Sequence, residues 1–189
     1  MIHEIHEMHE MIRSEIHMKK TNLIFIGMPA VGKSTVGVVV AKRLGKKFID
    51  TDLLIQEQEK KLLREIIAEV GEDGFLEVEN QVNRDLEVEN AVISPGGSVV
   101  YCEEAMQHYK EIGTVVYLQA SYQTIKRRIR NPKKRGVVLR EGQTFQDLYN
   151  ERVKLFEKYA DITICEDDCQ IEETIEKVLE KVEKNAGTM

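Results

Sequence analysis

The chain has 189 residues, three cysteines and a formal net charge of −6 at pH 7, with an isoelectric point near 5.5. This length suits one compact domain, and the acidic balance argues against general affinity for nucleic acid or an anionic membrane surface. No apolar run approaches the roughly 18 residues of a membrane-spanning helix. Three cysteines are too few for a disulfide framework, so the composition predicts a reduced, cytoplasmic protein.

Residues 1–20 differ in character from the rest of the chain. His3, His6 and His9 recur every three residues, a spacing that can bind a divalent ion adventitiously. The segment lacks an apolar core and a small-residue cleavage site, so it is not a signal peptide. We interpret it as an N-terminal extension, disordered or not native to the fold, with Met18 as an alternative start.

A glycine-rich stretch follows the first apolar run of the chain. Leu23–Ile26 leads into the octapeptide Gly27-Met28-Pro29-Ala30-Val31-Gly32-Lys33-Ser34, after which a helical pattern begins. The spacing G-x-x-x-x-G-K-[ST] between a strand and a helix is typical of a loop whose backbone N–H groups surround a bound phosphate. The predicted nucleotide contacts are Gly27, Pro29, Ala30, Val31, Gly32, Lys33, Ser34 and Thr35.

Two side chains of this loop have more specific predicted roles. Lys33 brings a mobile positive charge to the β- and γ-phosphates, and Ser34 starts the helix, where its hydroxyl can bind magnesium. The alternative is a plain glycine turn between strand and helix. Because all four fixed positions match and the flanking elements fit, the pattern favours ATP and Mg²⁺ as cofactors.

The second predicted strand lies in residues 47–52 and carries two carboxylates at its end, Asp50 and Asp52. Ligands of open α/β sheets bind beyond the carboxyl ends of the strands, and strand alternation places both side chains on one face. We assign Asp50 to the metal, through water, and Asp52 to a substrate hydroxyl, for which it can act as the base. The alternative is that Asp52 only caps a helix at residues 53–59.

Residues 53–90 are predicted to be helical, with Gly71 as a stop. A buried strand, Ala91–Ser94, then ends in Pro95-Gly96-Gly97. Glycines at a strand end let a ligand approach the backbone closely, although a simple turn is the alternative. The pattern is therefore compatible with a ligand that lies close to Gly96 and Gly97.

The C-terminal half supplies a basic stretch at residues 126–135. It is interpreted as a solvated helix face; a nucleic-acid patch is the alternative, but no aromatic residues interleave with it. The remaining predicted elements are strands at 114–118 and 162–164 and helices at 122–130, 145–159 and 171–182.

These motifs together resemble the shikimate kinases, a family of the nucleoside-monophosphate-kinase-like P-loop proteins. The resemblance spans about residues 21–183 and rests on the glycine loop, Phe48-Ile49-Asp50-Thr51-Asp52, Gly96-Gly97, Arg152 and Tyr159-Ala160-Asp161. It implies a three-layer α/β P-loop fold with a five-stranded parallel sheet in the order 2-3-1-4-5. It further implies a single kinase domain at 21–185, a helical substrate-binding subdomain at about 53–90, a lid at about 131–144 and a tail at 186–189.

The resemblance also implies an activity, the transfer of the γ-phosphoryl group of ATP to a hydroxyl, with shikimate as the first-choice acceptor. Lys33, Asp52 and Arg135 are the implied catalytic residues, Arg135 closing the lid over ATP with Arg140 as its alternative. Arg152 matches an arginine that binds the substrate carboxylate, and Gly96 and Gly97 match glycines that bind substrate hydroxyls through their backbone N–H groups. As an alternative, Arg152 is a surface residue paired with Glu151 or Asp147.

One position departs from the family pattern. The pattern G-E-x-x-F-R-x-x-E supplies a second carboxylate-binding arginine, whereas residues 71–79 place Leu76 there. Leucine cannot replace a bidentate carboxylate donor, so the substrate lacks shikimate's carboxylate or is held differently, with Arg64 and Arg84 as candidate replacements. The alternatives are a same-fold kinase for another polyol, sugar acid or amino-alcohol, and a nucleotide-binding switch. The expected partner is a small hydroxylated substrate, and the expected state a monomer or weak homodimer.

Overall fold

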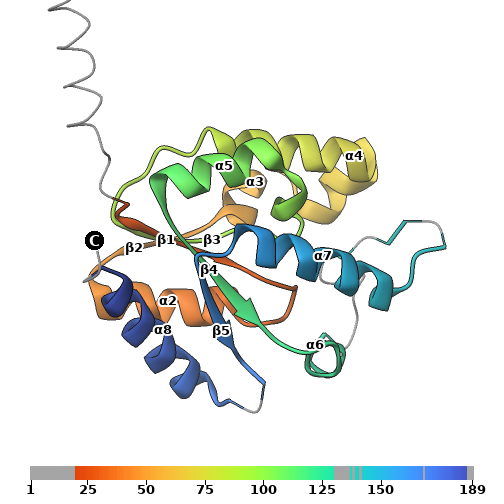
Figure 1. Ribbon diagram of the computed structural model, residues 1–189. Helices are drawn as coiled ribbons and strands as arrows, with labels where there is room; N and C mark the ends of the chain where they lie inside the picture. Colours follow the sequence, from red (N-terminus) through yellow and green to blue (C-terminus); the bar gives the residue numbers. More distant parts are fainter. Residues whose placement is uncertain (1–19, 130–136, 138, 141, 168, 187–189) are drawn as a thin grey trace, which may run out of the picture.

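A computed structural model describes residues 20–129, 137, 139–140, 142–167 and 169–186. Its centre is a five-stranded parallel sheet in the order β2-β3-β1-β4-β5, which confirms the predicted order (Figure 1). In β1, Leu23 pairs with Val92 of β3 on one side and with Thr114 of β4 on the other. The strands are β1 (Asn22–Ile26), β2 (Lys47–Asp50), β3 (Ala91–Ser94), β4 (Gly113–Gln119) and β5 (Ile162–Cys165).

Helices cover both faces of the sheet and so produce the three layers (Figure 1). One layer contains α2 and α8, which contact each other, and the other contains α5 and α7. The helices are α2 (Lys33–Leu44), α3 (Thr51–Glu59), α4 (Leu63–Arg84), α5 (Glu103–Ile112), α6 (Tyr122–Arg128), α7 (Phe145–Tyr159) and α8 (Ile171–Ala186), with a 3₁₀ turn, η1, at Val99–Tyr101.

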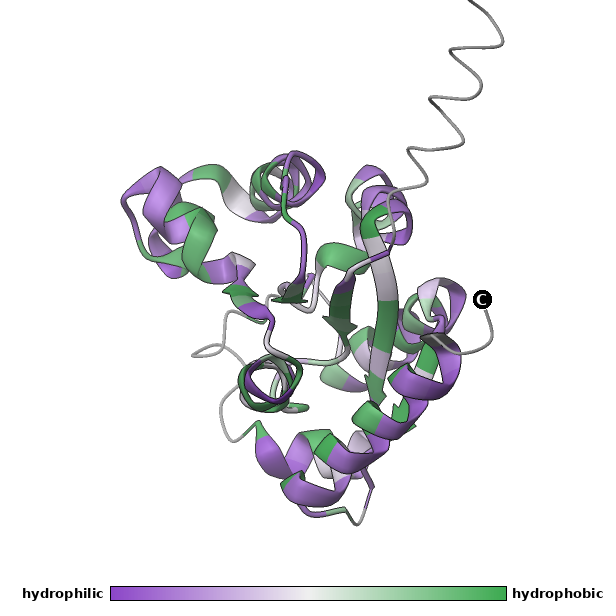
Figure 2. Ribbon diagram, turned by 90° about the vertical axis from the view of Figure 1, so that its left-hand side faces the viewer, coloured by the Kyte–Doolittle hydropathy of each residue, from purple (hydrophilic) through white to green (hydrophobic). Residues whose placement is uncertain are grey.

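The apolar runs of the sequence become strands buried on both faces. All residues of β1 and β3 are buried, as expected for central parallel strands covered by helices. Figure 2 shows hydrophobic residues gathered on the strands and hydrophilic residues on the outer sides of the helices. Gly37 of α2 lies against Phe48 of β2, where an added Cβ atom would come within 2.7 Å of the ring. Helix and strand are therefore packed as closely as a glycine permits.

A second, smaller apolar cluster holds α3 and α4 together. It consists of Ile55, Ile66, Phe75 and Val82, and it is separate from the main core under the sheet. The cluster lies within the predicted substrate-binding subdomain. The domain and subdomain boundaries remain a prediction, and the N-terminal extension, most of the lid and most of the tail fall outside the described residues.

Gly71 interrupts the helical geometry, as predicted: its φ of 74° and ψ of −175° lie outside the helical region, and α4 consists of two helices that meet at this residue. Because glycine tolerates positive φ, it produces a kink there. The strand before the acidic pair ends at Asp50, so Asp52 lies in the first turn of α3 and not on a strand. Helix α5 was not predicted. In the described part of the chain, no helix is both long and apolar enough to cross a membrane.

Candidate active site

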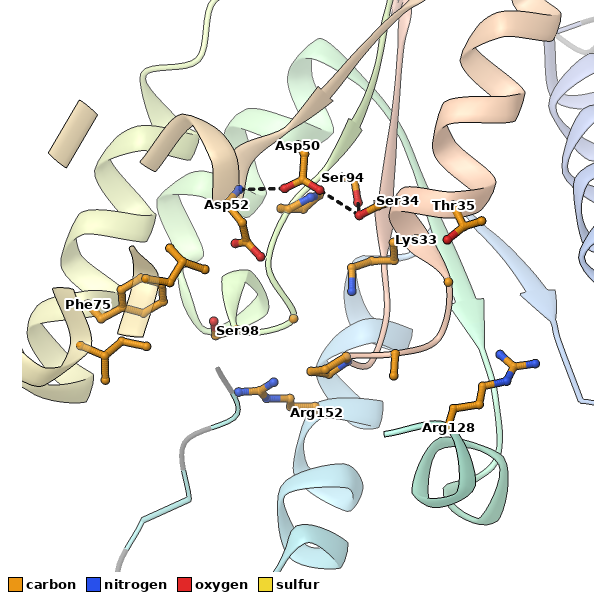
Figure 3. A pocket seen from close by; sticks show the side chains of 17 residues that line it. Lys33, Ser34, Thr35, Asp50, Asp52, Phe75, Ser94, Ser98, Arg128 and Arg152 are labelled. Carbon is orange, nitrogen blue, oxygen red and sulfur yellow. Dashed lines mark hydrogen bonds between the residues drawn. The ribbon is translucent and has the colours of Figure 1, made fainter. Parts of the chain in front are cut away.

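The glycine loop, the ends of β2 and β3 and helix α7 surround a cavity of about 370 Å³ (Figure 3). It lies beyond the carboxyl ends of the central strands, where open α/β sheets bind ligands. The predicted site residues that line it are Pro29, Ala30, Gly32, Lys33, Ser34, Thr35, Asp50, Asp52, Gly97 and Arg152. Gly27, Val31 and Gly96 are not among its lining residues, and Arg135 falls outside the described residues.

The loop between β1 and α2 has a backbone that requires glycine. Gly27 and Gly32 have φ values of 147° and 118°, which side-chain-bearing residues rarely adopt. A Cβ atom at Gly27 would lie 2.6 Å from the Leu118 carbonyl oxygen of β4. Helix α2 begins directly after the loop, so its unpaired N–H groups and partial positive charge face the cavity. This arrangement suits a bound polyphosphate.

The Lys33 side chain folds back over the phosphate loop. Its Nζ donates hydrogen bonds to the carbonyl oxygens of Gly27 (3.0 Å) and Met28 (3.3 Å). Burial lowers the pKa of Lys33 to about 8, an effect that the nearby Asp52 carboxylate partly offsets. Phosphate charges in the cavity would favour the protonated lysine, because opposite charges stabilise each other where water is excluded.

Ser34 and Asp50 form the polar contact between α2 and the end of β2. The Ser34 hydroxyl donates to Asp50 Oδ2 at 2.9 Å, and its oxygen lies 3.3 Å from that of Ser94 (Figure 3). The described residues contain no group of three or more His, Cys, Asp or Glu side chains suited to a metal. Magnesium in kinases needs only one or two protein oxygens, because waters and substrate phosphates complete its shell. Ser34 and Asp50 therefore fit a Mg²⁺ ion.

The second carboxylate of the pair, Asp52, faces the cavity (Figure 3). Burial and the neighbouring Asp50 raise the pKa of Asp52 to about 6, and Lys33 acts in the opposite direction. The capping alternative is wrong for Asp52, because Asp50 is the residue that caps α3, accepting from the Asp52 backbone N–H at 3.1 Å. The Asp52 side chain is thus available as a hydrogen-bond acceptor for a ligand hydroxyl.

Side chains from several parts of the chain pack closely against the paired glycines after β3. A Cβ atom at Gly96 would contact Glu79 Oε1 and lie 2.9 Å from Asp52 Oδ1. One at Gly97 would lie 2.9 Å from Pro29 of the phosphate loop and 3.3 Å from Arg152 Nη1. Because they have no side chains, these glycines leave room for the side chains of Glu79, Asp52, Pro29 and Arg152, which come from four different segments.

Arg152 projects from α7 into the same cavity and is only 6% exposed (Figure 3). Its guanidinium carbon lies 5.3 Å from the centre of the Tyr101 ring, and its Nε atom is buried without a hydrogen-bond partner. The surface interpretation of Arg152 is wrong, since Asp147 forms a capping box with the N-cap residue Thr144 and Glu151 accepts a hydrogen bond from Gln143. A buried guanidinium with an unused donor is suited to an anionic ligand group.

Sequence reasoning missed Glu79 of α4. Its side chain is fully buried, and neither carboxylate oxygen has a hydrogen-bond partner of good geometry in the described part of the chain. Burial raises the pKa of Glu79 to about 7, and the Ser98 hydroxyl nearby lowers it only in part. The signal was present, because Glu79 is the final glutamate of the pattern at residues 71–79.

A second missed feature ties α6 to the phosphate loop. Arg128 Nη1 donates to the Val31 carbonyl oxygen at 2.9 Å and to Glu166 Oε2 at 2.8 Å. Arg128 also lines the cavity. It lies in the basic stretch interpreted as a solvated face, an interpretation that is wrong for this residue because the charge run does not reveal which arginine turns inward.

The two candidate replacements for the missing arginine do not reach the cavity. Arg84 donates to Asp85 and Glu104 on the surface, and Arg64 is exposed at the start of α4. Leu76 lines a smaller adjoining cavity, together with Tyr101, Arg140 and Arg152. Arg140, the alternative lid arginine, therefore lies beside Arg152 and does not line the phosphate-loop cavity.

A phosphate loop in a 2-3-1-4-5 sheet, with an acidic pair and a buried arginine facing it, defines a P-loop protein of the small-molecule kinase type. The family model for shikimate kinase matches residues 29–183. A shikimate kinase of Clostridium botulinum (strain Okra) is 35% identical over 170 residues, which cover 88% of this chain and 98% of that protein. One of Chlorobium chlorochromatii is 33% identical over 184 residues, 90% and 96% of the two chains.

Among the solved structures similar to this chain are also shikimate kinases. The shikimate kinase of Aquifex aeolicus superposes with a TM-score of 0.77 at 33% identity, covering 87% of this chain and 98% of its own. That of Acinetobacter baumannii, in complex with shikimate, has a TM-score of 0.80 at 27% identity, covering 91% and 98%. The chain belongs to the shikimate kinase family, and the resemblance inferred from its motifs is confirmed.

Proposed function

We propose that this protein transfers the γ-phosphoryl group of ATP to a hydroxyl of shikimate and so forms shikimate 3-phosphate. Family membership supports the reaction class. The observation that carries the proposal is that Lys33, Asp52 and Arg152 come from three distant segments and line one cavity beside the phosphate loop. A phosphoryl-transfer enzyme needs this kind of arrangement, since its catalysis depends mainly on positioning and electrostatics.

The nucleotide side of the site is formed by the glycine loop and α2. Backbone N–H groups from Gly27 to Thr35 would bind the phosphates, and Lys33 would balance the charge that develops on the transferred group. Ser34 and Asp50 would hold Mg²⁺, which, when bound, neutralises phosphate charge. Arg135 remains our candidate for a further phosphate-binding side chain.

The acceptor side is formed by Asp52, the paired glycines and Arg152. Asp52 would accept a hydrogen bond from the reacting hydroxyl and orient its oxygen toward the phosphate, taking up the proton as transfer proceeds. Gly96 and Gly97 leave room for the acceptor next to their backbone. Arg152 would bind the acceptor's carboxylate through charge-assisted hydrogen bonds.

The proposed reaction is tested by coupling ATP consumption to detection of the phosphorylated product. Shikimate and a panel of polyols, sugar acids and amino-alcohols serve as acceptors. We expect turnover of shikimate at about 1–100 per second, the usual range for kinases. Activity with another acceptor alone would replace shikimate by that compound. Tight ATP binding without turnover of any acceptor would instead favour the nucleotide-binding switch.

Three further predictions belong with this proposal. The protein is expected to act in the cytoplasm, without nucleic acid, as a monomer or weak homodimer. The three cysteines, Cys102, Cys165 and Cys169, are free thiols in the structure.

A further inference from the structure

The pattern of this family places two arginines on the acceptor's carboxylate, and this chain has Leu76 at one of the two positions. We propose that Arg140, which precedes α7 in the chain, supplies the second guanidinium group. This assignment rests on the proposed function, because it concerns how a carboxylate-bearing acceptor is held. It makes Arg140 a specificity-determining residue for the acceptor and not a phosphate-binding residue.

The positions of the two guanidinium groups carry the inference. Both pack on the ring of Tyr101, with Arg152 at 5.3 Å and Arg140 at 5.9 Å from its centre. Tyr101, Arg140 and Arg152 line one small cavity, of which Leu76 and Ser98 form another part of the wall. Arg152 and Ser98 also line the main cavity, so the two spaces adjoin. Arg140 is therefore placed on the acceptor side, next to the leucine that replaces arginine.

The backbone of Arg140 is held in place by α7. Its N–H donates to Gln143 Oε1 at 3.2 Å, and its carbonyl oxygen accepts from the Gln143 N–H at 2.9 Å. Gln143 Nε2 donates in turn to Glu151 Oε2 at 3.1 Å. Glu151 directly precedes Arg152, so one turn of α7 fixes both arginines.

The donors of Arg140 are available to a ligand. Arg140 Nη1 forms an ion pair with Glu151 Oε1 at 3.8 Å, which is too long for a hydrogen bond, and the Arg140 side chain is 61% exposed. Glu72 is the one carboxylate among the described residues lining this small cavity, and no ion pair joins it to either arginine. Two guanidinium groups on one ring repel each other, and an incoming carboxylate would relieve that repulsion.

The leucine at position 76 also leaves a nearby carboxylate of α4, that of Glu79, without a cationic partner on the same helix. An arginine there would lie three residues before Glu79, a spacing at which opposite charges pair on a helix. With leucine in its place, Glu79 is buried with two unpartnered oxygens. The cation that would balance Glu79 is missing from α4, while an additional arginine stands beside Arg152. In this proposal the second carboxylate-binding arginine comes from position 140 and not from position 76, within the same small cavity.

The test is a steady-state comparison of Arg140→Ala with wild type. We expect KM for shikimate to rise about 10- to 100-fold, the effect of losing one charge-assisted bond. We expect kcat and KM for ATP to change less than about twofold. Arg43→Ala is the matched control, because Arg43 is an arginine of α2 paired with Glu176 outside both cavities.

A rescue variant distinguishes the loss of a substrate contact from a general loss of stability. In Leu76→Arg/Arg140→Ala, the arginine is restored on α4, and we expect KM for shikimate to recover at least partly. The methyl ester of shikimate, which has no charge on its carboxyl group, should be used equally well by wild type and Arg140→Ala. A fall in kcat with a raised KM for ATP, and an unchanged KM for shikimate, would instead assign Arg140 to the phosphates and overturn the inference.

Failure of the proposed function is distinguishable from failure of this inference. If wild type does not phosphorylate shikimate, the proposed function is wrong as stated. Calorimetric titration of shikimate and the sugar acids into wild type and Arg140→Ala then decides the role of Arg140, since binding needs no phosphoryl transfer. Weaker binding of a carboxylate by the variant supports the proposed role of Arg140 in binding the acceptor. Equal affinities, or no carboxylate binding by wild type, overturn it.

Discussion

The Ser34 hydroxyl donates a 2.9 Å hydrogen bond to Asp50 Oδ2, and this bond joins the first turn of α2 to the end of β2. Ser34 is the last residue of the phosphate-loop octapeptide, whereas Asp50 is 16 residues further along the chain. Two oxygens of the type that magnesium prefers are thus held within hydrogen-bond distance by separate elements. The local sequence supplies one of them and the parallel sheet supplies the other.

Asp50→Asn should raise the magnesium concentration needed for half-maximal activity about tenfold or more, because a metal contact loses its charge. Asparagine still caps a helix well, so α3 should remain intact. A magnesium titration of the rate at saturating ATP measures the change. An unchanged magnesium dependence would remove Asp50 from the proposed metal site.

Lys33→Met should lower kcat about 100- to 1,000-fold, the cost of removing one donor from the developing charge of a transition state. The loop should keep its shape, because its backbone is determined by Gly27 and Gly32. The coupled assay gives the rate, and Lys42→Met, on the exposed side of α2, is the control. Equal rates for Lys33→Met and wild type would contradict the proposed role of the loop.

Glu79→Gln should change how stability depends on pH. The folded protein raises the pKa of Glu79 from 4.5 to about 7, so the neutral carboxyl favours folding fully below pH 4.5. That contribution is lost as pH rises through about 7, with a cost on the order of 3 kcal/mol above it. The variant has no charge to bury, so its stability relative to wild type should increase over this pH range.

Denaturant unfolding of both proteins between pH 4 and 8 measures this difference. Glu77→Gln is the control, because Glu77 lies on the exposed side of the same helix. A constant difference between wild type and Glu79→Gln across the range would show that the Glu79 carboxylate is already compensated in the folded protein.

Gly96→Ala should impair acceptor use more than nucleotide use. The added methyl group would press on Asp52 and Glu79, and crowding of a packed site typically costs about 1–3 kcal/mol. We expect kcat/KM for the acceptor to fall at least tenfold while KM for ATP changes little. Gly45→Ala is the control: its φ of 63° makes alanine strained, but the space around it is open. Similar activity losses in both variants would indicate general destabilisation and not a local effect.

The parts of the site that are local in sequence could be predicted, and those assembled by the fold could not. The phosphate loop lies within eight consecutive residues between a strand and a helix, so its pattern was sufficient. The capping role of Asp50 was missed because it depends on whether the strand ends one or two residues earlier. Glu79 is brought near Asp52, and Tyr101 near Arg152, only by tertiary packing.

The departure at Leu76 was visible in the sequence, but its consequence was not. A pattern shows that an arginine is missing without showing where another cation enters. Arg64 and Arg84 are near in sequence, yet they point to the surface, whereas Arg140 comes from a segment 64 residues after Leu76. Closeness to Leu76 in the sequence therefore did not predict which arginine lies close to it in the folded protein.

The tight contact between Gly37 and Phe48 bears on the metal site, although neither residue touches it. Gly37 is three residues beyond Ser34 on α2, and Phe48 is two residues before Asp50 on β2. The missing methyl group of one and the flat ring of the other thus determine how far apart the two proposed magnesium ligands stand. The affinity for Mg²⁺ therefore depends partly on how closely α2 and β2 pack at this apolar contact. A larger residue at position 37 would push the two elements apart and weaken metal binding without changing either ligand.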